Sequence, residues 1–259
     1  MPERRSRILL IVGAACLAIS TAFAATNSGA QAVSGAATDS VVATTAPGNL
    51  IWRTDVAVQA AMQERRGNAG AGAAAASRAF NWWGGTGVVV FAALLWLGAR
   101  ALGMRTISRI GLRGAEGLAI ASALSGIAKG LTGRSRPFMV PGEPWNWDFN
   151  HGWSDARYFS MPSGHTTATV AFAVAAAVAA WRTRRAGGAV FGVIVLASAV
   201  CVGFARMYAD QHWLSDVLAG AALGTATSLS LAAIHARTTA IGYHRVMLGN
   251  TATDLPEGR

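Results

Sequence analysis

Five apolar runs, each close in length to a membrane-spanning helix, set the strongest limit on how this chain can fold. They cover residues 84–102, 112–131, 166–181, 189–205 and 213–234. A helix crosses a bilayer with about 20 consecutive apolar residues, a length that the third and fourth runs only approach. Their many Gly and Ala residues allow close contact between helices. We therefore predict an all-α transmembrane bundle, and length alone leaves a buried bundle in a soluble protein as the alternative.

The N-terminus carries one further apolar run, from residue 8 to residue 24. A basic flank precedes it and Ala22-Phe23-Ala24 ends it, which is typical of a secretory signal peptide. The run is also just long enough to be a first transmembrane helix. We favour a signal peptide for residues 1–24, and in both interpretations the next segment begins outside the cytoplasm. The bundle is thus expected to have five or six spans.

The rest of the chain divides into three parts by composition. Residues 25–80 are predicted to be a flexible or interfacial extracytoplasmic segment, because Ala, Thr, Ser and Gly dominate its start and only a weak helical pattern follows residue 49. Residues 81–240 hold the five runs and form the predicted membrane domain. Residues 241–259 are expected to be a cytoplasmic tail.

The charge pattern indicates how the runs are oriented. Charged residues make up only 13% of the chain, against about 25% in soluble domains, and the net charge is +10. The arginines gather in short clusters between apolar runs, which argues against nucleic acid as a partner and for loops beside an anionic lipid surface. If these clusters are cytoplasmic, the connections 129–165 and 206–212 face outward together. We therefore expect an inner-membrane protein whose site faces the periplasm or the exterior.

Four cations lie beside spans on this predicted outer side: Lys129, Arg134, Arg136 and Arg206. A lone cation at the end of a span usually anchors the helix at the membrane surface. Four of them on the side that is normally poor in positive charge suit a bound phosphate, to which arginine offers two parallel N–H groups and lysine a point charge. We interpret them as a phosphate site.

The sequence Pro162-Ser163-Gly164-His165 directly precedes the third run. Ser163 fits a helix N-cap, which is the purely structural interpretation. The N–H groups at a helix start also bind anions, and Gly164 permits close approach. Ser163 and Gly164 are therefore candidate phosphate ligands, with His165 beside the anion.

His212 and Asp216 lie four residues apart and so share one face of a helix. Asp216 can accept the proton of one ring nitrogen and leave the other as a nucleophile. Taken alone, the pair also fits a structural His–Asp contact or two ligands of a metal ion. The cations nearby argue against a metal, and no zinc-type Cys/His spacing exists. We expect no metal and no other cofactor.

Together the three stretches resemble the type 2 phosphatidic acid phosphatase (PAP2) superfamily. Its pattern is Lys-x6-Arg-Pro, then Pro-Ser-Gly-His, then Ser-Arg-x5-His-x3-Asp, and order and spacing match within residues 82–235. The chain departs from the pattern at Ala205, where the family usually has Ser. The lost hydroxyl affects one supporting hydrogen bond and none of the charged or nucleophilic roles. Arg134 lies outside the pattern, and its role is open.

The resemblance implies a role for each matched residue. His212 would attack phosphorus and form a phosphohistidine, Asp216 would orient its ring, and His165 would protonate the leaving oxygen and then activate water. Cations and helix-start N–H groups would hold the phosphate oxygens in place of metal ions: Lys129, Arg136, Arg206, Ser163 and Gly164. The other histidines are expected to be spectators: His151, His235 and His244.

The predicted function is a metal-independent membrane phosphatase acting on a lipid phosphate or pyrophosphate monoester, with the bilayer and that lipid as its partners. The same site would serve a lipid phosphotransferase, and a haloperoxidase-like enzyme or a non-enzymatic anionic-lipid-binding protein are weaker alternatives. The motifs indicate the phosphate and not the lipid, and nothing in them indicates the oligomeric state. The aromatic-rich loop 137–161 is typical of interfacial anchoring and also suits the rim of an acyl-chain or prenyl-chain site.

Overall fold

The computed structural model describes residues 49–183 and 186–247, with side chains up to residue 238. The regular secondary structure of these residues is entirely helical, apart from one isolated β-bridge in the connection between the helices Arg105–Thr132 and Gly164–Trp181. The all-α prediction is thus confirmed. The predicted signal peptide or first helix, the start of the 25–80 segment and the last residues of the predicted tail lie outside the described residues. The elements follow in this order: α2 (Leu50–Asn68), α3 (Ala71–Trp82), η2 (Trp83–Gly87), α4 (Val88–Ala93), η3 (Leu94–Gly98), α5 (Ala99–Ala101), α6 (Arg105–Thr132), η4 (Ala156–Tyr158), α7 (Gly164–Trp181), α8 (Ala186–Tyr208) and α9 (Leu214–Met247).

Four helical stretches in the described chain are long and apolar enough to cross a membrane. One is the continuous helix Ala71–Ala101, which contains the two π-helical turns η2 and η3. The others are α7, α8 and the Leu214–Thr238 part of α9. The predicted run 112–131 lies in α6, whose arginines, glycines and serines dilute its apolar residues. The predicted count of five or six spans is therefore not confirmed.

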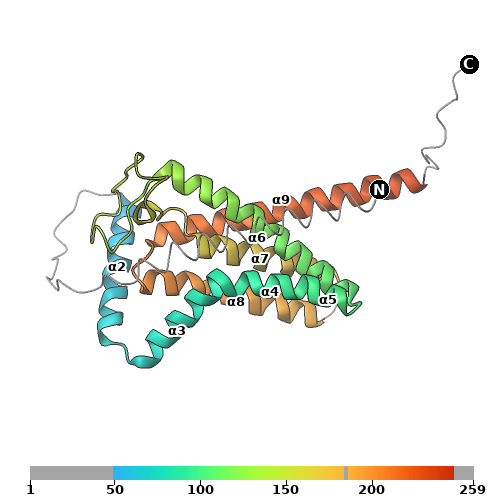
Figure 1. The fold of residues 1–259 in the computed structure, drawn as a ribbon, viewed down its shortest axis with the longest axis horizontal. Coiled ribbons are helices and arrows are strands. Elements are labelled where there is room, and N and C mark those ends of the chain that lie inside the picture. Colours follow the sequence, from blue (N-terminus) through green and yellow to red (C-terminus); the bar gives the residue numbers. More distant parts are fainter. Residues whose placement is uncertain (1–48, 184–185, 248–259) are drawn as a thin grey trace, which may run out of the picture.

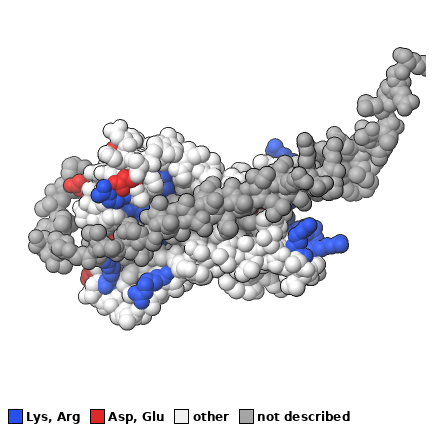
Figure 2. Space-filling model, viewed as in Figure 1, with Lys and Arg blue, Asp and Glu red and all other residues white. Residues whose placement is uncertain are grey.

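α7 is the central helix of the bundle and packs against α6, α8 and α9 (Figure 1). Half of its buried positions are alanines, and its Phe172 fills a core closed by Val88, Leu118 and Val195. Many large apolar side chains on the outer helices are exposed, among them Leu94, Ile127, Val193, Phe204 and Leu218. In Figure 2 the described Lys and Arg gather towards the two ends of the long axis, with white surface between them. This distribution fits a lipid-facing belt.

α9 approaches α7 through Gly220 and Gly224, which lie one turn apart. A Cβ on Gly220 would lie 2.7 Å from the carbonyl oxygen of Ser163, and one on Gly224 would lie 2.6 Å from that of Thr167. Only glycine permits this backbone contact. Asp216 lies one turn before Gly220, and its carbonyl oxygen accepts a hydrogen bond of 2.9 Å from the Ser163 N–H. The two glycines therefore fix the height of Asp216 relative to the start of α7.

The connection between α6 and α7 folds back over the end of α6. Gly133 ends α6 in the left-handed conformation, with a φ of 55°. The next three residues run extended between residues 146–148 and 157–160 and make backbone hydrogen bonds to both sides. This pairing fixes the backbone that carries Arg134 and Arg136.

We expect Gly224→Val to lower the free energy of unfolding by about 1–3 kcal/mol, because the added atoms overpack the α7–α9 contact. Thermal unfolding in detergent micelles measures the change. Gly126→Val is the matched control, since a Cβ at Gly126 has no neighbour within 4 Å. Equal losses of stability in both variants would show that the α7–α9 contact tolerates the larger side chain.

Candidate active site

The three sequence stretches meet at one end of the bundle. Lys129 lies in the last turn of α6, His165 in the first turn of α7 and Arg206 near the end of α8. His212 lies in the turn before α9, and Asp216 lies in the first turn of that helix. All five side chains are buried. Residues up to 87 positions apart in sequence thus form one cluster, as the motif spacing predicted.

Polar groups of the loops hold Lys129 and Arg136 in place. The Lys129 Nζ donates to the carbonyl oxygen of Phe159 at 2.6 Å. The Arg136 Nε donates to the carbonyl oxygen of Ala156 at 3.0 Å, and its Nη1 donates to the Gln211 Oε1 at 2.5 Å. Burial lowers the pKa of Arg136 to about 10, so this guanidinium stays charged at neutral pH. The sequence did not indicate the part that Gln211 plays.

Arg206 is oriented by Asn81 from α3. Its Nη1 donates to the Asn81 Oδ1 at 2.9 Å, and the Asn81 Nδ2 approaches the carbonyl oxygen of Ala205 at 3.5 Å. The Arg206 Nε is buried and has no hydrogen-bond partner among the described residues. A buried N–H without an acceptor costs about 1–3 kcal/mol. An anionic oxygen at this place would remove that cost.

His212 and Asp216 lie close together without a hydrogen bond. The His212 Nδ1 is 3.7 Å from the Asp216 Oδ2, and it has no hydrogen-bond partner among the described residues. Both carboxylate oxygens already accept bonds, Oδ1 from Arg134 at 2.5 Å and Oδ2 from the Ser160 hydroxyl at 2.5 Å and the Trp213 N–H at 2.9 Å. The predicted pair is thus assembled but its hydrogen bond is not made.

The surroundings of His212 favour a neutral ring. Burial lowers the pKa of His212 well below its ordinary value, and the positive charges of Arg206, Lys129 and Arg136 lower it further. A neutral imidazole keeps a lone pair on one ring nitrogen. His212 therefore carries the protonation state of a nucleophile at neutral pH.

The start of α7 lies beside the same cluster. Ser163 is its N-cap residue and fully buried, and the Ser163 hydroxyl accepts a bond of 3.0 Å from the Thr166 hydroxyl. The Ser163 N–H is engaged by the carbonyl oxygen of Asp216. N–H groups that bind an anion here must therefore come from Gly164 and the residues after it.

A pair of glycines in η2 makes room for His165. A Cβ on Gly85 would lie 3.0 Å from the His165 Nε2, and one on Gly84 would lie 3.3 Å from the His165 Cβ and 2.5 Å from Val202. No role for these glycines could be predicted from the sequence. Their only signal was a Gly-Gly pair at the start of an apolar run.

Asp55 of α2 completes a buried network around Arg134, the residue whose role the sequence left open. The Arg134 Nη2 donates to Asp55 at 2.8 Å, and its Nη1 donates to Asp216 and to the Ser215 hydroxyl at 2.5 and 2.7 Å. Asp55 also accepts from the Ser215 N–H at 2.8 Å. The side chains of both ion pairs are at most 2% exposed. Arg134 therefore joins α2, the α6–α7 loop and α9, and holds Asp216.

α2 also binds both loops through Gln59. The Gln59 Nε2 donates to the carbonyl oxygen of Pro137 at 3.3 Å and to the Asp210 Oδ1 at 3.2 Å, and its Oε1 accepts from the Gly142 N–H at 3.0 Å. The buried residues of this helix are thus the polar Asp55 and Gln59. A helix that buries polar groups gives little hydrophobic periodicity, which explains the weak pattern in its sequence.

We expect Asp55→Ala to lower the free energy of unfolding by up to about 3–5 kcal/mol, because it leaves the buried Arg134 charge with one carboxylate in place of two. Chemical denaturation in detergent measures this loss. Glu64→Ala is the matched control, since it removes an exposed carboxylate from the same helix. An Asp55→Ala protein as stable as wild type would contradict the assigned importance of the network.

Comparison with known proteins gives two matches. Residues 112–240 match the PAP2 superfamily. A lipid A 1-phosphatase from Rhizobium etli is 34% identical over 116 residues, which cover 44% of this chain and 45% of that protein. The matched part is therefore less than half the length of the relative. No solved structure matches the chain.

Proposed function

Because the chain belongs to the PAP2 superfamily, we propose that it is a membrane phosphatase that hydrolyses a lipid phosphate or pyrophosphate monoester. The charge balance of the site carries this proposal. The buried charged residues of the described chain comprise four cations and two carboxylates, Asp55 and Asp216. The excess of two positive charges suits a phosphate monoester, which carries about −1.5 to −2 at pH 7. Burial of such an excess without an anion would be costly.

The hydrogen bonds of the three motif cations support the same conclusion. Lys129 and Arg136 are held by neutral carbonyl and amide oxygens, and Arg206 is held by the neutral Asn81. Neutral partners of this kind orient a cation without neutralising its charge, and the Asp216 carboxylate also acts on Lys129 and Arg136. The Arg206 Nε supplies a donor that no described residue accepts from. We assign these three cations to the phosphate oxygens.

Catalysis then proceeds in two displacements. The lone pair of His212 attacks phosphorus and forms an N–P bond, the bond from phosphorus to the lipid oxygen breaks, and His165 gives that oxygen a proton. A water molecule next gives His165 a proton while its oxygen attacks phosphorus, which breaks the N–P bond and releases phosphate. Cations stabilise the charge on the transferring group in both steps, so the mechanism requires no metal ion.

Asp216 has a positioning role in this mechanism. Its Oδ2 is 3.7 Å from the His212 Nδ1, so a small movement of the ring would complete a hydrogen bond as the ring becomes positive. Arg134 and Ser160 fix the carboxylate for that contact. We therefore assign Arg134 as a second positioning residue, acting through Asp216.

The surroundings of the site support a lipid as the substrate. Trp145, Phe149 and Trp153 of the α6–α7 loop are 47%, 67% and 62% exposed, which suits contact with lipid. The relative from Rhizobium etli is named a lipid A 1-phosphatase, which also supports a lipid as the substrate. The arginine distribution supports a location in the inner membrane with the site facing the periplasm or exterior.

We expect the purified protein to release phosphate from at least one lipid phosphate in the presence of a chelator, and orthovanadate to inhibit it. The panel is phosphatidic acid, phosphatidylglycerol phosphate, a polyprenyl pyrophosphate and lipid A. His212→Ala should lower kcat by at least about 10⁴-fold, whereas His151→Ala, which changes an exposed loop histidine, should not. Full dependence on added metal would contradict the mechanism, and transfer of phosphate to a lipid acceptor would identify a phosphotransferase.

The pH profile should reflect the lowered pKa of His212. Protonation of the nucleophile stops attack, so the acidic limb of kcat/KM should lie below pH 6.5, the ordinary pKa of histidine. Arg206→Gln removes one charge that disfavours protonation, so the limb should move to higher pH as activity falls. Substrate ionisation is followed separately by ³¹P NMR. An acidic limb unchanged by Arg206→Gln would show that another group controls it.

A further inference from the structure

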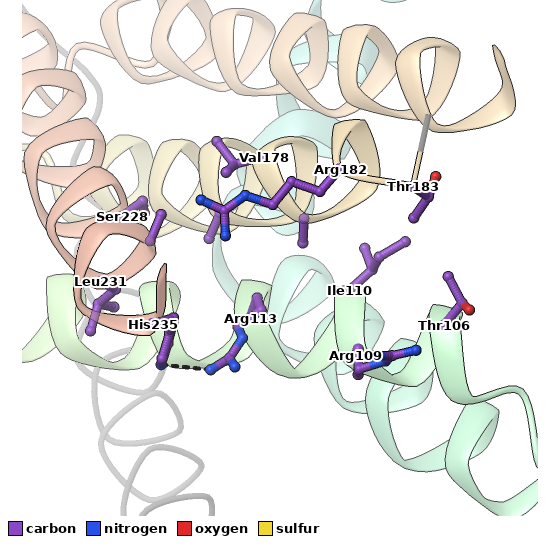
Figure 3. A pocket seen from close by; sticks show the side chains of 13 residues that line it. Thr106, Arg109, Ile110, Arg113, Val178, Arg182, Thr183, Ser228, Leu231 and His235 are labelled. Atoms are coloured by element: carbon purple, nitrogen blue, oxygen red, sulfur yellow. Dashed lines mark hydrogen bonds between the residues drawn. The ribbon is translucent and has the colours of Figure 1, made fainter. Parts of the chain in front are cut away.

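A pocket lies between α6, α7 and α9, away from the candidate active site. Its volume is about 450 Å³, within the range of small-ligand sites. The charged and titratable groups that line it are Arg109 and Arg113 of α6, Arg182 after α7 and His235 of α9 (Figure 3). Each of these helices also contributes to the candidate active site, through residues at its other end.

The positions along the helices give the separation of the two sites. Lys129 follows Arg109 by 20 residues on α6, which corresponds to about 30 Å at 1.5 Å per residue. Arg182 follows His165 by 17 residues, which corresponds to about 26 Å. These lengths are close to the thickness of about 30 Å of the hydrocarbon core. The pocket and the candidate active site thus lie at opposite ends of the bundle, about one hydrocarbon-core thickness apart.

The arginines that line the pocket outnumber the carboxylates that pair with them among the described residues. Arg113 donates to Glu116 at 2.8 Å and contacts the His235 Nε2 at 2.6 Å, the interaction drawn in Figure 3. Glu116 also lies 3.4 Å from His235. Arg109 donates only weakly to the carbonyl oxygen of Arg105, at 3.4 Å, and neither Arg109 nor Arg182 has an ion pair among the described residues. Two guanidinium groups are therefore available to an anion.

The rest of the lining is apolar. Ile110, Val178 and Leu231 line the same pocket as the arginines. A cavity with guanidinium groups and aliphatic walls suits an amphiphile with an anionic head. We propose that this pocket binds a phosphate group, with the headgroup of an anionic lipid as the source that the apolar walls favour. The membrane leaflet opposite the candidate active site would supply that lipid.

The test uses dioctanoyl phosphatidylglycerol, a phosphodiester that is not a substrate of the monoester chemistry proposed for the active site. Its binding to the full chain in neutral detergent is measured by titration and by the rise in Tm. Arg109→Gln/Arg182→Gln should weaken binding by about ten-fold or more, because the headgroup loses its charge-assisted hydrogen bonds to both guanidinium groups. Arg237→Gln is the control for loss of a nearby positive charge, as it removes one exposed arginine from the same region of α9 outside the pocket.

The comparison ligands separate the possible sources of the phosphate group. Dioctanoyl phosphatidylcholine should bind weakly, since its headgroup has no net charge. Inorganic phosphate that binds as well as the lipid, and is lost in the double variant, would identify free phosphate as the ligand. Phosphate binding that survives in the double variant belongs to the candidate active site. The proposal is overturned if the double variant binds phosphatidylglycerol like wild type, or if Arg237→Gln loses binding equally.

Discussion

The buried Arg134 guanidinium and the two carboxylates beside it, Asp55 and Asp216, are the interaction on which the rest of the site depends. Each of the three side chains would be costly to bury alone, so the network exists only when α2, the α6–α7 loop and α9 are all in place. It therefore couples the folding of the loops to the assembly of the bundle. The same contacts hold the carboxylate that faces His212.

Besides the Arg134 network, the site depends on helices that approach each other closely, which small side chains in the bundle allow. The α7–α9 glycine contact places Asp216 beside the start of α7, and the glycine pair of η2 leaves space for His165. Small residues thus set where the polar residues meet, and the polar residues supply the specificity. The proposed phosphate site therefore needs both the small residues that allow the close helix contacts and the polar residues that those contacts bring together.

Much of this arrangement could be predicted from the sequence, because it depends on spacing. The spacing of four residues brings His212 close to Asp216, although His212 lies in the turn before α9 and not on a helix face shared with Asp216. The motif order brings Lys129, His165 and Arg206 to the ends of neighbouring apolar runs. Asp55, Asn81 and Gln211 could not be found in this way. Each is an ordinary polar residue whose role appears only when a distant arginine lies beside it. The number of spans could not be predicted from the sequence either. The apolar residues of α6 are interspersed with arginine, glycine and serine, and this helix is not among the four stretches apolar enough to cross a membrane.

The α2 network has a consequence for how this protein is divided into parts. The region that matches the superfamily begins at residue 112, yet Asp55, Gln59 and Asn81 all precede it. A fragment cut at the family boundary would keep every motif residue and lose the partners of Arg134 and Arg206. A chimera that joined this motif region to another protein's N-terminal helices would face the same deficit. The functional unit of this chain is therefore larger than its recognisable domain.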